Sequence, residues 1–144
     1  MSQYHEPNKT YDELSWDTIH QLHSAISNFS KQSFDIKKLF ITVVISALTL
    51  IYSIAKSIDL SLFVTVAIIV GLFYSLDTMT YYYQDKLRAK MVGEQNKIRE
   101  RNGISAITYN RNNRRILRSL FNWSHLLYAL ILGLDIILYF IFCE

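Results

Sequence analysis

Four hydroxyl side chains recur at helical spacing in the first apolar segment of the chain. Thr42, Ser46, Thr49 and Ser53 follow one another at steps of four, three and four residues, which puts them on one face of a helix. Small hydroxyl residues allow two membrane helices to approach closely and to hydrogen-bond across the contact. A row of them can also line a water-filled pore. The pattern therefore predicts either a helix–helix seam or a pore face.

A single carboxylate, Asp135, lies inside the last apolar segment, about 10 Å from its outer end at a rise of 1.5 Å per residue. A carboxylate within a membrane is costly, and it is expected to face the interior of a bundle or a water-filled cavity. Thr49 lies at a similar depth. We therefore expect Asp135 to face the hydroxyl row, in the same or a neighbouring subunit. A buried carboxyl with a purely structural hydrogen bond is the alternative.

Other side chains are candidates for contacts between helices. Asp77 and His125 are expected at similar depths near the inner boundary, and whether they pair is left open by the sequence. Small residues at four-residue steps are typical of closely packed membrane helices. They are Ala67, Gly71 and Ser75 in the second apolar segment, and Ala129 and Gly133 in the third.

The sequence indicates no enzyme chemistry. It contains no nucleophile constellation, phosphate-binding loop, dinucleotide fingerprint or zinc-protease motif. His20 and His23 share a helical face, but two ligands do not make a metal site. The single cysteine, Cys143, offers no disulfide framework. We expect a protein that is not an enzyme and that uses no cofactor or metal.

Three uncharged or nearly uncharged windows position these residues. The first two, Leu39 to Ala55 and Leu60 to Leu76, have seventeen residues each, and the third runs from Leu120 to Phe142. A helix needs about 20 apolar residues to cross a bilayer, with about 17 as the lower limit. Only Lys56 to Asp59 separates the first two windows, so they are expected to form a helical hairpin. A soluble bundle is disfavoured because no window has a charged stripe.

The positions of Lys and Arg predict the orientation. Fourteen of the fifteen basic residues lie before the first window or between the second and the third, Lys56 lies in the turn, and none follows the third window. Because basic residues accumulate on the cytoplasmic side, the N-terminus is expected in the cytoplasm and the C-terminus outside it. Trp123 is expected to anchor the third span at the inner interface.

The sequence thus predicts an all-α integral membrane protein with four regions. They are a cytoplasmic amphipathic helix in 1–36, a two-span transmembrane hairpin in 37–77, a basic cytoplasmic helix and connector in 78–119, and a third transmembrane helix in 120–144. The second span is expected to continue into the cytoplasm and to stop near Asn102 and Gly103. Residues 104–109 are candidates for a brief strand.

The cytoplasmic extension carries a seam with coiled-coil-like spacing. Its members are Leu76, Tyr83, Leu87, Met91 and Ile98. The partner of this seam is either the N-terminal helix or the same helix of another subunit, and we expect a homo-oligomer in which both contacts occur. Basic residues around it can hold anionic lipid headgroups, a nucleotide or a nucleic acid. These residues are Lys86, Arg88, Lys90, Arg111, Arg114 and Arg115.

A short motif at the end of the second span resembles the SLATT-type bacterial membrane proteins. In that family the span typically ends in a Leu-Asp-aromatic stretch, followed by an acidic residue and arginines. Leu76-Asp77, Tyr81-Tyr82-Tyr83, Asp85 and Arg88 stand at comparable places. The spacing from Asp77 to Asp85 is one residue longer than usual, and aspartate replaces the more frequent glutamate. The likeness covers residues 15–102 and leaves out the third span.

The resemblance implies a membrane effector of a prokaryotic antiviral, abortive-infection system. Such a protein would oligomerise in the bacterial inner membrane and permeabilise or depolarise it when a cytoplasmic sensor protein or a nucleotide signal triggers it. Its C-terminus would then be periplasmic or extracellular. Two other functions are compatible with the sequence: a non-toxic membrane anchor or assembly subunit that recruits a cytoplasmic partner, and a phage holin-like or exclusion protein.

Overall fold

The chain is helical throughout its regular structure in a computed structural model, which describes residues 11–56, 58–108 and 115–143. Its elements are α1 (Tyr11–Ala55), α2 (Leu60–Arg101), α3 (Arg115–Leu120), the short 3₁₀ helix η1 (Trp123–His125) and α4 (Leu126–Cys143). No strand occurs among these residues. The prediction of an all-α fold is confirmed for the described part of the chain.

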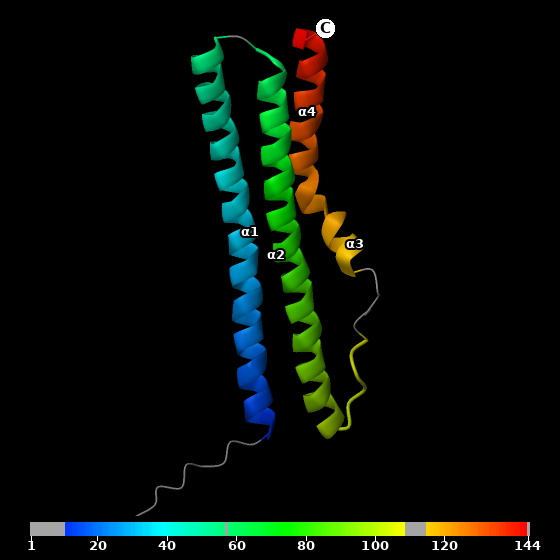
Figure 1. Ribbon diagram of the computed structural model, residues 1–144. Coiled ribbons are helices and arrows are strands. Elements are labelled where there is room, and N and C mark those ends of the chain that lie inside the picture. The colour runs from blue at the N-terminus through cyan, green and yellow to red at the C-terminus, as the bar shows by residue number, and fades with distance from the viewer. Residues whose placement is uncertain (1–10, 57, 109–114, 144) are drawn as a thin grey trace, which may run out of the picture.

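Two long helices form an antiparallel pair, and the third packs along only part of it (Figure 1). α1 has 45 residues and α2 has 42, so each is about 65 Å long at 1.5 Å per residue. This is about twice the hydrocarbon thickness of a bilayer. α4 lies beside the half of α2 that is nearest the α1–α2 turn, and it ends at the same end of the molecule as that turn. Half of the pair thus extends beyond α4.

The predicted N-terminal helix and first span are one continuous helix. α1 runs without a break through residues 36 and 37, where the sequence changes from polar to apolar. The predicted boundary between 1–36 and 37–77 therefore marks a change from polar to apolar sequence within one helix, and not the end of one helix and the start of another. Rotation or translation of the polar half of α1 would therefore also move its apolar half.

The hairpin turn is short and is closed by local hydrogen bonds. Lys56 has a left-handed backbone with φ of 50°, and its N–H donates to the Tyr52 carbonyl at 2.9 Å. Asp59 caps α2 by accepting from the N–H and the hydroxyl of Ser61, at 3.1 and 2.6 Å. These bonds, led by that of the Ser61 hydroxyl, hold the pKa of the Asp59 carboxyl below its usual range. The predicted helical hairpin is confirmed.

Within the part of the chain that the structure describes, two helices are long and apolar enough to cross a membrane by length and composition. They are α2 and the segment Trp123–Phe142, whose most apolar stretches have mean hydropathies of 2.0 and 2.1. Only 28% and 17% of those stretches are buried inside the protein, so most of their apolar surface faces outward. The span predicted at Leu39 to Ala55 forms the last part of α1 and stays a prediction.

We call the part of the helical pair between the α1–α2 turn and residues Lys37 and Asp77 the apolar half, and the rest of the pair the polar half. The apolar half is held together by a small core from α1, α2 and α4. Phe40 and Val44 of α1, Val66 and Val70 of α2 and Tyr128 of α4 form one buried cluster. The rings of Phe40 and Tyr128 are 4.8 Å apart. Phe40 therefore links α1 directly to α4 across the pair.

In the polar half, α1 is the partner of the predicted seam. Tyr83 stacks on Phe29 of α1 with ring centroids 6.3 Å apart, and Leu87, Met91 and Ile98 are half-buried. Leu76, by contrast, is mostly exposed. The intramolecular partner is thus found at Tyr83, and the partner of the other seam residues, including a contact between subunits, stays a prediction.

The predicted strand after α2 is wrong for residues 104–108, which form no regular structure; residue 109 lies outside the described residues. Side chains of α2 bind this segment instead of a partner strand. Asn96 accepts from the Ile107 N–H at 2.7 Å and donates to its carbonyl at 3.0 Å, and Arg99 donates to the Ser105 carbonyl at 2.7 Å. The predicted end of α2 is correct, because Asn102 caps it and Gly103 has φ of 68°.

The third span also differs from its predicted bounds. α3 ends at Leu120, and a new helical segment begins at Trp123. Asn122 between them is extended, with φ of −94° and ψ of 138°, and its side chain accepts from the Ser124 N–H. This cap starts η1 and breaks the helix that the sequence predicts from Leu120 onward.

Candidate functional site: a buried charged junction of three helices

Asp77 is a fully buried carboxylate at the centre of the molecule, with 0% of its side chain exposed. It follows directly after the second apolar window. Two residues of α1, one helical turn apart, bind its two oxygens. Lys37 Nζ donates to Oδ2 at 2.5 Å, and the Ser33 hydroxyl donates to Oδ1 at 2.5 Å. Lys37 Nζ also donates to the Ser33 hydroxyl at 2.8 Å.

His125, the last residue of η1 directly before α4, also approaches this carboxylate. Its Nε2 lies 3.7 Å from Asp77 Oδ2, and it has no hydrogen-bond partner among the described residues. Its Nδ1 lies 2.9 Å from the Leu120 carbonyl. Because a carbonyl can only accept, Nδ1 carries the proton in this arrangement. A neutral imidazole then turns a lone pair toward Asp77, whereas a second proton on Nε2 would give that carboxylate another donor.

Three tyrosines surround the charges. Tyr74 donates to the Leu120 carbonyl at 2.7 Å, and its ring centroid is 4.8 Å from that of His125. Tyr81 lies under Lys37, whose Nζ is 5.6 Å from the ring centroid. The buried hydroxyl of Tyr128 has no hydrogen-bond partner within the described part of the chain and lies within electrostatic reach of Asp77. We call these seven residues the junction: Ser33, Lys37, Tyr74, Asp77, Tyr81, His125 and Tyr128.

Polar contacts continue from the junction toward the free ends of α1 and α2. Gln84 donates to the Ser30 hydroxyl at 2.5 Å, and near the helix ends Arg101 Nε lies 2.7 Å from an oxygen of Asp12. These contacts fix the register of the long pair, because a shift by one turn would separate each of them. The apolar core lies on the other side of the junction, so the junction marks the border between the two halves.

The sequence predicts only part of the junction. The proximity of Asp77 and His125 is confirmed, although the distance is longer than a hydrogen bond. The roles of Ser33 and Lys37 were not foreseen. A usable signal existed, because the midpoint of the sequence from Lys37 to Asp77 falls within the predicted turn, Lys56 to Asp59. In an antiparallel hairpin, residues at equal distances from the turn lie opposite each other.

The hydroxyl row lies on one exposed side of α1. Thr42, Ser46, Thr49 and Ser53 are all exposed, which agrees with a shared face. Three of the hydroxyls, those of Thr42, Thr49 and Ser53, donate to carbonyls four residues earlier, at 3.1, 2.8 and 2.7 Å. Their hydrogen bonds are thus made within the helix itself, and their side-chain surface stays free for lipid, water or another helix.

Asp135 does not meet the hydroxyl row within one chain. It is buried, with 9% exposed, and lies one helical turn before Tyr139, which packs edge-on against Phe63 of α2 with centroids 5.5 Å apart. Asp135 therefore lies on the α2 side of α4, whereas the row is exposed on α1. The same-chain contact that we expected is not found, and the contact with a neighbouring subunit stays a prediction.

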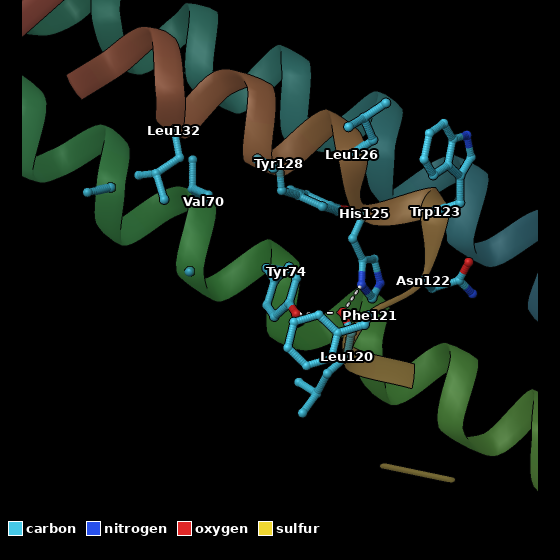
Figure 2. A pocket seen from close by; sticks show the side chains of 13 residues that line it. Val70, Tyr74, Leu120, Phe121, Asn122, Trp123, His125, Leu126, Tyr128 and Leu132 are labelled. Carbon is cyan, nitrogen blue, oxygen red and sulfur yellow. Dashed lines mark hydrogen bonds between the residues drawn. The ribbon is translucent and has the colours of Figure 1, made fainter. Parts of the chain in front are cut away.

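The predicted close packing of small residues is also not found within one chain. Ala67, Gly71 and Ser75 are exposed, and a Cβ built on Gly71 or Gly133 meets nothing within 4 Å. Ala67, Gly71 and Ala129 instead line a pocket between α2 and α4 with a volume of about 570 Å³ (Figure 2). The rings of Tyr74 and Tyr128 meet edge-on between α2 and α4 with centroids 6.1 Å apart, and they line the same pocket.

Three of the residues predicted to hold an anion are exposed on α2, and the binding itself stays a prediction. Lys86, Arg88 and Lys90 lie on the outside of the polar half. Arg111 and Arg114 lie outside the described residues, and Arg115 begins α3 without a described side chain. Within the described ranges, no three His, Cys, Asp or Glu residues are arranged to hold a metal ion.

The fold and the junction define an all-helical chain with two candidate membrane-spanning helices and a buried ion pair at the border of its apolar half. The chain matches no protein-family model, no curated protein and no solved structure. The function proposed below therefore rests on the chain's own residues and on the resemblance noted in its sequence.

The ion pair makes a prediction for stability. Lys37→Met leaves a fully buried carboxylate without its cation, and we expect it to lower the free energy of unfolding by about 3 kcal/mol. Asp77→Leu should cost less, because Lys37 is 17% exposed and can turn its ammonium toward water. The double variant should come within about 1 kcal/mol of the natural chain. Unfolding in detergent checks the order, and additive losses in the double variant would contradict the pairing.

Proposed function

We propose that this chain is a membrane effector of a prokaryotic antiviral system, which oligomerises and permeabilises the inner membrane when it is triggered. The observation that carries the proposal is the exposed hydroxyl row on the apolar half of α1. Four polar groups on one outer face are unexpected if that face only contacts lipid. They suit a face that lines water when several copies assemble. The antiviral setting comes from the SLATT resemblance alone.

The hydrogen bonds of the row suit a protein with two states. Since Thr42, Thr49 and Ser53 donate to their own helix, these three hydroxyls can rest against lipid without an unpaired donor. After assembly the same hydroxyl oxygens can still accept hydrogen bonds from water. Asp135 would add a carboxyl at a similar depth from a neighbouring subunit once α4 turns during assembly, because within one chain it is buried on the α2 side of α4.

The junction suits the role of a gate. It connects α1, α2 and α4 at the end of the apolar half. The polar halves of α1 and α2 extend from it, so a movement of their free ends would be transmitted to the junction. A sensor protein or nucleotide that moved these ends would pull on Lys37 and Asp77. Breaking a buried ion pair is costly, so the resting state would persist until the trigger binds.

A non-toxic anchor that recruits a cytoplasmic partner is the second candidate. Large exposed apolar side chains at the free end of the helical pair favour it. They are Tyr11, Leu14 and Trp16 of α1 and Ile104 and Ile107 after α2. A partner docked there would suit either candidate, and the two are distinguished by whether the chain lets ions through a membrane.

Cell growth and membrane potential during expression test the proposal. Ser46→Leu puts an apolar side chain in the middle of the row, and Asp135→Asn removes the charge in the third span. We expect both variants to abolish toxicity and depolarisation while still inserting in the membrane. Ile45→Leu, at the exposed neighbouring position, is the matched control and should stay toxic. Full toxicity of both test variants would exclude the hydroxyl row as a pore face.

The orientation can be tested with the native cysteine. Cys143 is the only cysteine of the chain, and we expect it outside the cytoplasm, at the same end as the α1–α2 turn. A membrane-impermeant maleimide should label it in intact spheroplasts. A Cys143→Ser chain with Glu100→Cys, at an exposed position near the end of α2, should be labelled only after the membrane is opened. Labelling in the reverse order would contradict the proposed orientation.

A further inference from the structure

The pocket between α2 and α4 is a long apolar groove with a polar end. It is lined by the small residues Ala67, Gly71 and Ala129, and by Leu126 and Leu132 of α4. Its volume of about 570 Å³ lies in the range of sites that hold small molecules. At one end it is lined by Asn122 and Trp123 (Figure 2), and Trp123 is 84% exposed.

A second, polar pocket of about 120 Å³ adjoins this end. The two pockets share Asn122, and the polar one is also lined by Arg88, Tyr81 and Gln84. Arg88 is exposed and makes no ion pair with another described residue. Asp85, which lines the same pocket, is already engaged in an interaction. A cation and a neutral amide thus stand next to the polar end of an apolar groove.

We propose that this composite site binds one anionic phospholipid of the inner leaflet. The acyl chain would lie in the groove over Gly71, and the phosphate would accept hydrogen bonds from Arg88 and Asn122. An exposed tryptophan at the polar end is typical of the bilayer interface. A helix of a second copy would cover the groove without using Arg88 and Asn122, so the polar end favours the lipid.

The bound lipid would also contact the junction. His125 and Tyr128 line the groove, and both lie beside the buried Asp77 carboxylate. A lipid in the groove would press these two side chains toward Asp77, and loss of the lipid would leave the α4 side of the junction less packed. This inference rests on the membrane insertion that the proposed function requires, but not on permeabilisation.

Lipid retention by the purified protein tests the site. The delipidated chain is titrated in detergent with phosphatidylglycerol or phosphatidylcholine, and bound lipid is counted by native mass spectrometry. We expect one phosphatidylglycerol per chain. Gly71→Leu fills the groove, and since a Cβ there meets nothing, the fold should be unaffected. Phosphatidylglycerol should then bind at least about tenfold more weakly. Gly93→Leu, also in open space but on the polar half of α2, should bind normally.

Two further variants test the polar end. Arg88→Gln should remove the preference for phosphatidylglycerol over phosphatidylcholine, whereas Lys90→Gln, exposed on the same helix, should keep it. Unchanged phosphatidylglycerol binding by Gly71→Leu would overturn the proposal. The proposal would also be overturned if Gly71→Leu weakened self-association of the chain and left phosphatidylglycerol binding unchanged, because the groove would then be an interface between copies. Ion leakage is measured separately, so failure of the lipid site does not count against the pore, nor the reverse.

Discussion

The ion pair between Lys37 and Asp77 is the interaction on which the rest of the structure depends. A carboxylate with no exposed surface loses its hydration, and the low dielectric around it makes an unpaired charge very costly. Two donors from α1 compensate this cost at both oxygens of Asp77. The donors come from one face of α1, so the pair fixes the rotation of α1 as well as its register against α2. An apolar contact at this position would permit more sliding and rotation.

The ion pair between Lys37 and Asp77 sets which residues of α1 and α2 meet in both halves of the molecule. Toward the turn, Phe40 and Val44 of α1 are brought against α2, and Tyr128 of α4 completes the buried cluster. Toward the free ends, Ser30 meets Gln84 and Asp12 meets Arg101. α4 depends on the same ion pair through His125, whose Nε2 faces Asp77 without a hydrogen bond to any described residue. A change in the charge of Lys37, Asp77 or His125 would therefore alter the packing of α1, α2 and α4 together.

The sequence predicts the elements well because hydropathy and capping are local properties. The hairpin and the stop at Asn102 and Gly103 both follow from residues close to the feature itself, whereas the partner of the seam at Tyr83 was left open. The break at Asn122 was missed because one extended residue is enough to end a helix, and an apolar composition hides it. The brief strand was wrong because Asn96 and Arg99 of α2 bind that segment with their side chains.

The site is harder to predict because it depends on the rotation of each helix. Lys37 looks like one more positive charge at a membrane boundary, and only its position opposite Asp77 shows its role. The direction of Asp135 and the open space over Gly71 depend on how large rings such as Tyr128 set the spacing of α2 and α4. These are properties of the packed helices and not of any one segment.

The central claim, that the junction holds the resting state of a pore lined by the hydroxyl row, is tested most directly by potassium efflux from liposomes containing the purified chain. Asp77→Asn keeps the shape of the side chain and removes its charge, and we predict that it leaks without a trigger while the natural chain stays tight. Adding Ser46→Leu to Asp77→Asn should stop the leak. Liposomes with Asp77→Asn as tight as those with the natural chain, or an equal leak in the double variant, would contradict the account.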